Sequence, residues 1–291
     1  MMITRKRATA LLGAAFLLPH CSGSSSSAIR VGSKNFTEEF IIAELYARSL
    51  EAAGMSVERK FNLGSTQIAM AALQRGDIDL YPEYSGTGLI DVLHLAPMRD
   101  ADALFAVVKK EFKSKYDLVW LNPSPMNDSQ GLATTQAIAS KYNIHTLTQL
   151  SVAAPQLRLA AIAEFLDRAD ALPGLQKFYG GFRFKSVRTF DPGLKYQALL
   201  QGSADVVQAF TTDSQIATNN LIVFEDDKHF WPAYHVAPVV RADALVKFPK
   251  LAATLNALAP RITDAAIRAM NGQVDAQHQE PADVAKAFLK K

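Results

Sequence analysis

Aromatic, acidic and hydroxyl side chains are concentrated in one short segment, Tyr81-Pro82-Glu83-Tyr84-Ser85-Gly86-Thr87-Gly88. The residues before it, 76–80, predict a short strand with alternating apolar side chains that ends at Pro82. Ligands of open α/β sheets bind outside the carboxyl ends of strands. A tyrosine at that position offers a ring face to a cation and a hydroxyl to a polar group. The segment therefore predicts either a ligand-binding edge or an ordinary core strand followed by a turn.

The N-terminus has the pattern of an export signal. Residues 5–7 are basic, and residues 8–18 form an apolar stretch that is too short to span a bilayer as a permanent helix. Cys21, the only cysteine, precedes a Ser/Gly-rich spacer, as in lipid-anchored proteins, but His20 is larger than the residue that usually precedes a lipidated cysteine. We expect an exported protein that is either periplasmic or lipid-anchored through Cys21.

The charge of the chain excludes one broad class of function. Three of the 31 basic residues lie in the leader, and the rest equal the 28 acidic residues in number. A neutral domain lacks the electrostatic footprint of a nucleic-acid-binding protein. The roughly 265 residues after the leader are enough for two lobes of ordinary domain size.

The first part of the chain alternates between strand and helix patterns. Strands are expected at 28–32, 57–61 and 76–81, and helices at 35–54 and 64–73. A capping box of Asn35 and Glu38 is expected to begin the first helix. This order predicts an α/β fold with a parallel sheet.

A second lobe of similar construction follows. Residues 200–205 repeat, faintly, the pattern of residues 73–79, in which a helix end and a glycine precede an aspartate and an apolar strand. Two segments, Pro123-Ser124-Pro125 and residues 234–238, suggest the places where the chain crosses between lobes. The tail from residue 247 has apolar residues at helical spacing. The predicted division is a leader and spacer at 1–27, a first lobe at 28–127, a second lobe at 128–235, and a return to the first lobe with C-terminal helices at 236–291.

Several short motifs, in this order, resemble those of one family of receptors. They are Gly32-Ser33-Lys34-Asn35-Phe36-Thr37-Glu38, Phe61-Asn62-Leu63-Gly64-Ser65-Thr66, the segment from Asp79 to Thr87, Leu172-Pro173-Gly174-Leu175, Thr212-Asp213, Asp226-Asp227-Lys228, Tyr234 and Ala237-Pro238-Val239-Val240. The chain from about Ile29 to Leu258 is similar to the osmoprotectant-binding proteins of ABC importers, which bind glycine betaine, choline or carnitine. The resemblance implies a two-lobed type II periplasmic-binding-protein fold with the ligand cleft between the lobes.

The resemblance also implies an aromatic cage. A trimethylammonium group has no N–H to donate, so aromatic faces recognise it, each contributing about 0.5–2 kcal/mol. Tyr84 matches one wall of such a cage, Phe210 and Tyr234 match the second-lobe positions, and Asp128 matches the polar residue against the cationic head.

The tail of the ligand is assigned in the same way. Thr87 matches a hydroxyl contact to the tail, and Arg168 falls near the tail-binding arginine. Gln130 is a departure, because many relatives have an aromatic ring there; we expect it to line the pocket, with Trp231 as a candidate replacement for the ring. His235 is a second departure and introduces a group that titrates near neutral pH.

The implied function is that of a non-catalytic receptor that captures a quaternary amine and delivers it to a membrane permease. We expect a monomer with no cofactor, no metal and no nucleic-acid partner. With Gln130 in place of a ring, a different polar solute, such as ergothioneine or an amino-acid derivative, is the alternative. An enzyme on the same fold is the remote alternative, since the six histidines are scattered and there is neither a Gly-x-Ser-x-Gly elbow nor a phosphate loop.

Overall fold

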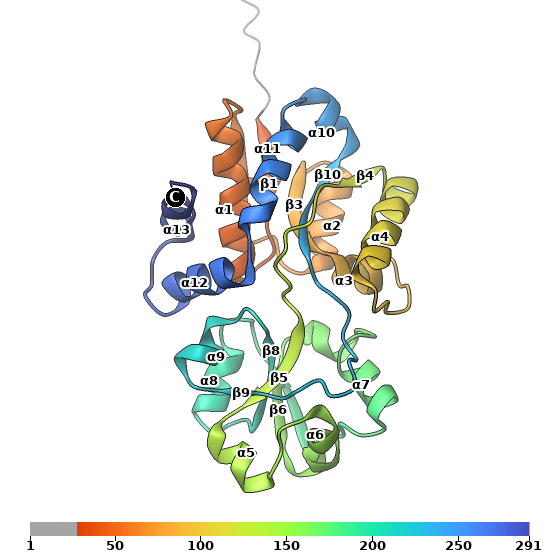
Figure 1. Ribbon diagram of the computed structural model, residues 1–291, viewed down its shortest axis with the longest axis vertical. Coiled ribbons are helices and arrows are strands. Elements are labelled where there is room, and N and C mark those ends of the chain that lie inside the picture. The colour runs from red at the N-terminus through yellow and green to blue at the C-terminus, as the bar shows by residue number, and fades with distance from the viewer. Residues whose placement is uncertain (1–27, 291) are drawn as a thin grey trace, which may run out of the picture.

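A computed structural model describes residues 28–290 as an α/β protein with two lobes, each built around a five-stranded sheet (Figure 1). The predicted leader, including Cys21, lies outside these residues. The first sheet has the strand order β2-β1-β3-β10-β4, and the second has the order β7-β6-β8-β5-β9.

The first lobe places helices on both faces of its sheet (Figure 1). Its strands are β1 (Ile29–Gly32), β2 (Val57–Lys60), β3 (Leu80–Tyr84), β4 (Leu118–Trp120) and β10 (Val236–Arg241). Its helices are α1 (Thr37–Ala52), α2 (Thr66–Arg75), α3 (Ser85–Thr87), η1 (Gly88–Val92), α4 (Ala101–Tyr116), α10 (Ala242–Lys247), α11 (Leu251–Leu258), η4 (Ala259–Arg261), α12 (Asp264–Asp275) and α13 (Pro281–Leu289). The C-terminal helices share one apolar core with α1, through residues such as Ile41, Leu255 and Ile267.

The second lobe is formed by the middle of the chain. Its strands are β5 (Gln130–Thr134), β6 (Arg158–Ala161), β7 (Ser186–Thr189), β8 (Val206–Phe210) and β9 (Ile222–Val223). Its helices are α5 (Gln136–Tyr142), α6 (Leu147–Ala153), η2 (Ala154–Gln156), η3 (Ala163–Leu166), α7 (Leu172–Tyr179), α8 (Lys195–Leu200) and α9 (Ser214–Thr218). Two segments, 121–129 and 224–235, run between the sheets, and we propose that the lobe boundaries lie in them.

The predicted parallel sheet is right for the first three strands and incomplete for the rest. β1 pairs in parallel with β2 and with β3, as the alternating pattern predicts. β10 then enters between β3 and β4 and pairs antiparallel with both. In the second lobe β5 likewise lies between two strands, β8 and β9, and pairs antiparallel with both. Both sheets are therefore mixed.

Two local predictions were wrong. Pro82 does not end its strand but lies inside β3, opposite Pro238; because β1 pairs with β3 only at Leu80, the strand is unpaired on that side beyond this residue, and a proline is tolerated at such an edge. Asn35 does not cap α1, whose N-cap is Phe36 without a side-chain bond. Glu38 is therefore free to point away from the helix end.

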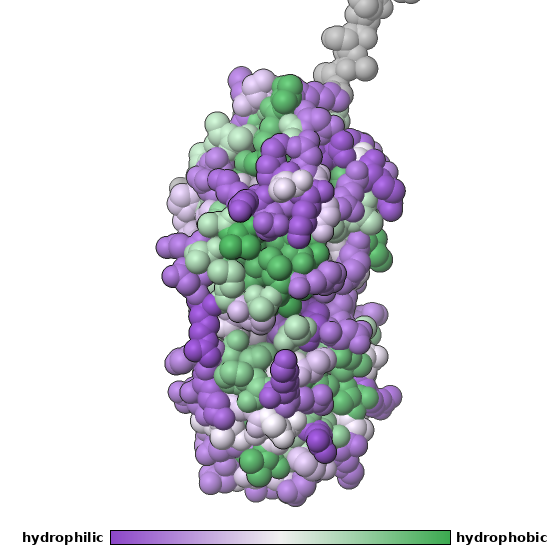
Figure 2. Space-filling model, turned by 90° about the vertical axis from the view of Figure 1, so that its right-hand side faces the viewer, coloured by the Kyte–Doolittle hydropathy of each residue, from purple (hydrophilic) through white to green (hydrophobic). Residues whose placement is uncertain are grey.

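The surface next to the junction of the lobes is apolar on one side. Figure 2 shows hydrophobic residues gathered on the half of the upper lobe that adjoins the lower one, on the side where α4 lies. Ile68 and Leu95 are among the large apolar side chains that the first lobe exposes. None of the described helices is long and apolar enough to cross a membrane.

Candidate functional site

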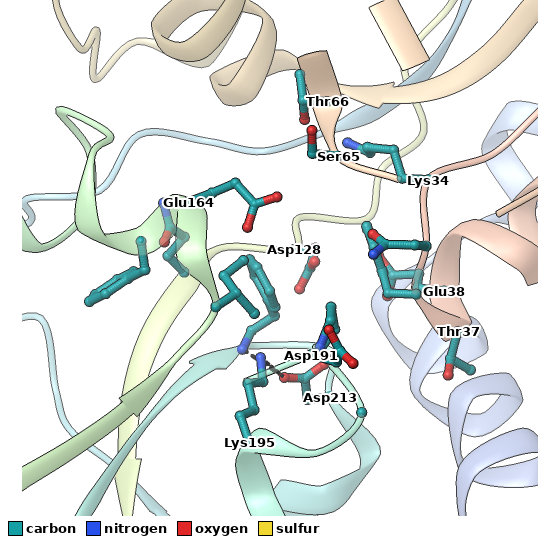
Figure 3. Close-up of a pocket in the computed structure, with 18 of the residues that line it drawn as sticks. Lys34, Thr37, Glu38, Ser65, Thr66, Asp128, Glu164, Asp191, Lys195 and Asp213 are labelled. Carbon is teal, nitrogen blue, oxygen red and sulfur yellow. Dashed lines mark hydrogen bonds and ion pairs between the residues drawn. The ribbon is translucent and has the colours of Figure 1, made fainter. Parts of the chain in front are cut away.

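A cavity of about 470 Å³ lies between the lobes and collects side chains from both (Figure 3). All seven residues proposed from the sequence line it: Tyr84, Thr87, Asp128, Gln130, Arg168, Phe210 and Tyr234. They come from the ends of β3 and β8, from α3, from the start of β5, from the loop between η3 and α7, and from the segments that join the lobes. The rule that ligands bind beyond strand ends explains why so short a motif marks the place.

Three aromatic rings form a row across the cavity. Phe36, which directly precedes α1, lies 6.3 Å from the ring of Tyr84 and 6.4 Å from the ring of Phe210. The planes of Phe36 and Phe210 differ by only 10°, so rings of the two lobes face each other. Sequence reasoning missed Phe36 as a site residue, although it lies inside one of the family motifs.

Two buried lysines already contact this row of rings. The Lys34 ammonium lies 4.7 Å from the centre of the Tyr84 ring, and the Lys195 ammonium lies 4.5 Å from the centre of the Phe210 ring. Each is held by carboxylates, Lys34 by Glu83 at 2.8 Å and Lys195 by Asp213 at 3.3 Å. A cationic ligand must therefore use the remaining faces and edges of these rings.

Asp170 lies behind the cavity lining and holds three lining residues in place, and sequence reasoning missed it. Its fully buried carboxylate accepts hydrogen bonds from Arg168 Nε at 2.8 Å (through Oδ1) and from Gln130 Nε2 at 3.1 Å and the Tyr234 hydroxyl (through Oδ2). Trp231 donates to the Asp170 carbonyl at 2.8 Å. The Gln130 amide nitrogen is thus committed to Asp170, and Trp231 is not among the residues that line this cavity.

Arg168 connects the lobes. Besides Asp170, its guanidinium reaches the first lobe, donating to the Thr87 hydroxyl at 3.3 Å and lying 3.7 Å from an Asp91 oxygen. The negative partners Asp170 and Asp91 keep this arginine charged although it is largely buried and raise its pKa. Much of its hydrogen-bonding capacity is therefore taken up inside the protein. His235, by contrast, contacts the Met126 carbonyl at 2.8 Å, outside the cavity lining.

Two carboxyl groups meet at the cavity without a basic partner. Glu38 of α1 and Asp128 each lie 2.6 Å from the same hydroxyl, that of Thr212. Glu38 also accepts hydrogen bonds from the Tyr84 hydroxyl at 2.7 Å and from Asn271 at 3.0 Å. Burial raises the pKa of both carboxyls, and for Asp128 the proximity of Glu38 raises the pKa further. Among residues 28–290 neither group forms an ion pair with Lys, Arg or His.

Comparison with known proteins identifies the family. Residues 27–291 match the substrate-binding domain of the ABC-type glycine betaine transport system. The chain belongs to this family. A glycine-betaine-binding protein of Pseudomonas aeruginosa is 33% identical over 277 residues, which are 92% of this chain and 88% of that protein.

Two further relatives extend the comparison. An ergothioneine transport permease/ergothioneine binding protein of Helicobacter pylori is 32% identical over 282 residues; the match spans 97% of this chain but only 50% of that protein. A crystal structure of a glycine betaine/carnitine/choline ABC transporter protein has a TM-score of 0.73 at 30% identity, covering 90% of this chain and 97% of that one. The two-lobed fold expected from the motifs is confirmed.

Family membership also settles the broad class of function. This is a family of transport binding proteins and not of enzymes, as the sequence indicated. The described part of the chain holds no group of three or more His, Cys, Asp or Glu side chains placed to bind a metal ion.

Proposed function

We propose that this chain is the solute receptor of an ABC importer, that it binds a quaternary-ammonium compound such as glycine betaine or choline between its lobes, and that it delivers this solute to a membrane permease. The observation that carries the proposal is the row of Tyr84, Phe36 and Phe210 next to the unpaired carboxyls of Glu38 and Asp128. Ring faces and negative charge are the two features that attract a cation with no N–H to donate.

Each ligand-binding residue proposed from the sequence has a role in this function. Tyr84, Phe210 and Tyr234 contribute rings, and Asp128 faces the cationic head. Thr87 and Arg168 face the tail of the solute. Gln130 acts through Asp170, which it helps to hold in place. The protein acts outside the cytoplasm, either free or attached to the membrane.

A second solute class has support from one relative. The Helicobacter protein is named for ergothioneine, a trimethylammonium compound with a heterocyclic ring. The rings of Phe36 and Phe210, which come from opposite lobes and are nearly parallel, would suit a flat heterocycle beside them. Ergothioneine is therefore the alternative ligand.

A panel of solutes tests the proposal. The melting temperature of the purified protein is measured with glycine betaine, choline, carnitine, proline betaine, ergothioneine and common amino acids. A ligand present at 100 times its Kd stabilises the folded state by about 2.7 kcal/mol, and the melting temperature rises accordingly. A response only to solutes without a quaternary ammonium group would overturn the proposed ligand class and leave the transport role.

The aromatic row is then tested by substitution. Phe36→Ala and Phe210→Ala are each expected to weaken binding of the stabilising quaternary amine by about 0.5–2 kcal/mol, from roughly twofold to thirtyfold in Kd. Phe178→Ala on α7 is the control, because this ring is 44% exposed and does not line the cavity. Unchanged Kd values in both cavity variants, measured by calorimetry, would contradict the cage.

A further inference from the structure

The positive charges that line the cavity are all matched by carboxylates of the protein. Lys34 pairs with Glu83 and lies 3.6 Å from Glu39. Arg168 pairs with Asp170, and Lys195 pairs with Asp213. None of these three cations is free of a carboxylate partner. A ligand carboxylate would have to compete with these internal partners.

Of the lining carboxyls outside these ion pairs, Glu38 and Asp128 are the two that share a hydrogen-bond partner. Glu38 belongs to α1 of the first lobe, and Asp128 lies across the cavity from it (Figure 3). Asp128 shortly precedes β5 and Thr212 shortly follows β8 of the second lobe. Glu38 is 4% exposed, Asp128 is 5% exposed and Thr212 is 1% exposed, so water cannot freely solvate the group. Both carboxyl residues line the cavity, so a ligand that enters it can reach them.

The number of hydrogens that these contacts require indicates that the arrangement holds a proton. The Thr212 oxygen lies 2.6 Å from Glu38 Oε2 and 2.6 Å from Asp128 Oδ1. Contacts this short need one hydrogen each, but a threonine hydroxyl has a single hydrogen and can donate it only once. The second hydrogen must come from a protonated carboxyl, so Glu38 and Asp128 share one proton through Thr212.

The neighbours of the pair do not supply a substitute for that proton. From β3 the Tyr84 hydroxyl and from α12 the Asn271 amide donate to Glu38, and both donors are neutral. Asp213 lies close enough to raise the pKa of both carboxyls, and its partner Lys195 is bound to it. Lys34 is turned to Glu83 and Glu39, and Asp275 of α12 adds a further negative charge to the lining.

We propose that the ligand's cationic head replaces the proton shared by Glu38 and Asp128, so that binding releases one proton to solvent and selects solutes with a net positive charge. The net charge of the site does not change, because the cationic head of the ligand brings in one positive charge and the released proton takes one away. This inference rests on the proposed function. It makes Glu38 a specificity-determining residue and favours a cation without a carboxylate, such as choline, over a zwitterion such as glycine betaine.

Calorimetry of the purified protein tests the exchange directly. Choline and glycine betaine are titrated at one pH in two buffers of different ionisation enthalpy, and the difference in heat gives the number of protons released. We expect about one proton for choline. We also expect choline affinity to rise between pH 5 and pH 9, by at most about tenfold per pH unit, while the pair holds its proton before binding.

Two substitutions in the pair, compared with one elsewhere in the lining, distinguish proton exchange from a simple loss of negative charge. Glu38→Gln and Asp128→Asn each leave one carboxyl, and both are expected to abolish the proton release and to flatten the pH dependence. Glu164→Gln removes one negative charge from the same lining without touching the pair, and it should keep the release. The wild-type titration decides the question even if a variant fails to fold.

The outcomes distinguish the inference from the proposed function. Choline binding with no proton release and no pH dependence overturns the inference alone. Tighter binding of glycine betaine than of choline also overturns the inference and keeps the proposed function. If no quaternary amine binds, both the inference and the proposed ligand class are wrong.

Discussion

At the scale of single residues, the site is defined by carboxyls whose charge depends on their neighbours. Glu39 and Glu38 are adjacent in α1, and both are buried, but they face different partners. Glu39 lies beside Lys34, and its Oε1 accepts no hydrogen bond from any residue in the described part of the chain. Burial raises the pKa of Glu39 to about 8, against a partial lowering by Lys34. The side chain therefore carries a proton at neutral pH.

This raised pKa makes stability depend on pH. Between the ordinary pKa of a glutamate and about 8, the unfolded chain loses the proton of Glu39 and the folded protein keeps it. The free energy of unfolding should therefore fall as pH rises through this range, and the Glu39 contribution should level off above about pH 8. Glu39→Gln keeps the neutral form at every pH and should remove a few kcal/mol of this fall.

Urea unfolding at pH 5 and pH 8 measures the effect. Glu38 and Asp128 have raised pKa values as well, so the variant should reduce the pH dependence without abolishing it. Glu58→Gln, at an exposed position on β2, is the matched control. A variant with the same pH dependence as the wild type would show that Glu39 is ionised in the folded protein.

At the scale of elements, the turn from β3 into α3 depends on a glycine. A Cβ on Gly86 would lie 2.5 Å from Cε1 of the Tyr234 ring and 3.0 Å from the Ala233 carbonyl oxygen. Gly86 thus lets the chain that returns from the second lobe pass directly against the strand end. The Tyr234 hydroxyl, in turn, contacts Asp170.

Gly86→Ala is therefore expected to displace the Tyr234 ring and disturb the Asp170 network. We expect a loss of about 1–3 kcal/mol in unfolding free energy, as for overpacking in a core, together with weaker ligand binding. Gly193→Ala is the control, because a Cβ there meets no atom within 4 Å although the residue also lines the cavity. Equal melting temperatures and Kd values for both variants would exclude this role of Gly86.

The same elements show what a sequence can predict. The sequence did not predict where β3 ends, because Pro82 lies inside the strand. The site residues near the ends of β3 and β8 were predictable from their local motifs, and Tyr84, Thr87 and Phe210 do line the cavity. Glu38 was instead assigned to a capping box, because its real partner Thr212 lies 174 residues away in the sequence. Asp170 and Lys195 were missed for the same reason. Their roles depend on contacts that only the folded lobes create.

At the scale of the whole molecule, the two lobes touch at both sides of the cavity. On one side Arg168 reaches Thr87 and Asp91. On the other side α12 of the first lobe meets α9 of the second, and this contact is polar. Asp275 accepts hydrogen bonds from Ser214 at 3.0 Å and from Gln215 at 3.1 Å. Receptors of two lobes work by closing on a ligand, so these bonds stabilise the closed arrangement.

The contact at α12 can be weakened at Asp275, which lines the cavity without contributing a ring or forming part of the Glu38–Asp128 pair. Asp275→Ala removes two hydrogen bonds between the lobes, each contributing about 0.5–1.5 kcal/mol. The open form should gain in population. Because only the closed form binds tightly, the loss of about 1–3 kcal/mol should raise the apparent Kd by at most roughly 5- to 150-fold. Small-angle X-ray scattering of the protein without added ligand should show a larger radius of gyration than for the wild type.

Two matched variants decide whether lobe closure is the cause. Ser214→Ala removes only a donor of the second lobe and leaves the bond from Thr37 to Asp275 intact, so it should act in the same direction with a smaller effect. Asp283→Ala removes an exposed carboxylate from the neighbouring helix α13 and should change neither quantity. If Asp275→Ala weakens binding while the radius of gyration stays that of the wild type, Asp275 acts on the ligand itself. Saturating ligand should return the variant to the wild-type radius, because a ligand that prefers the closed form shifts the population towards it.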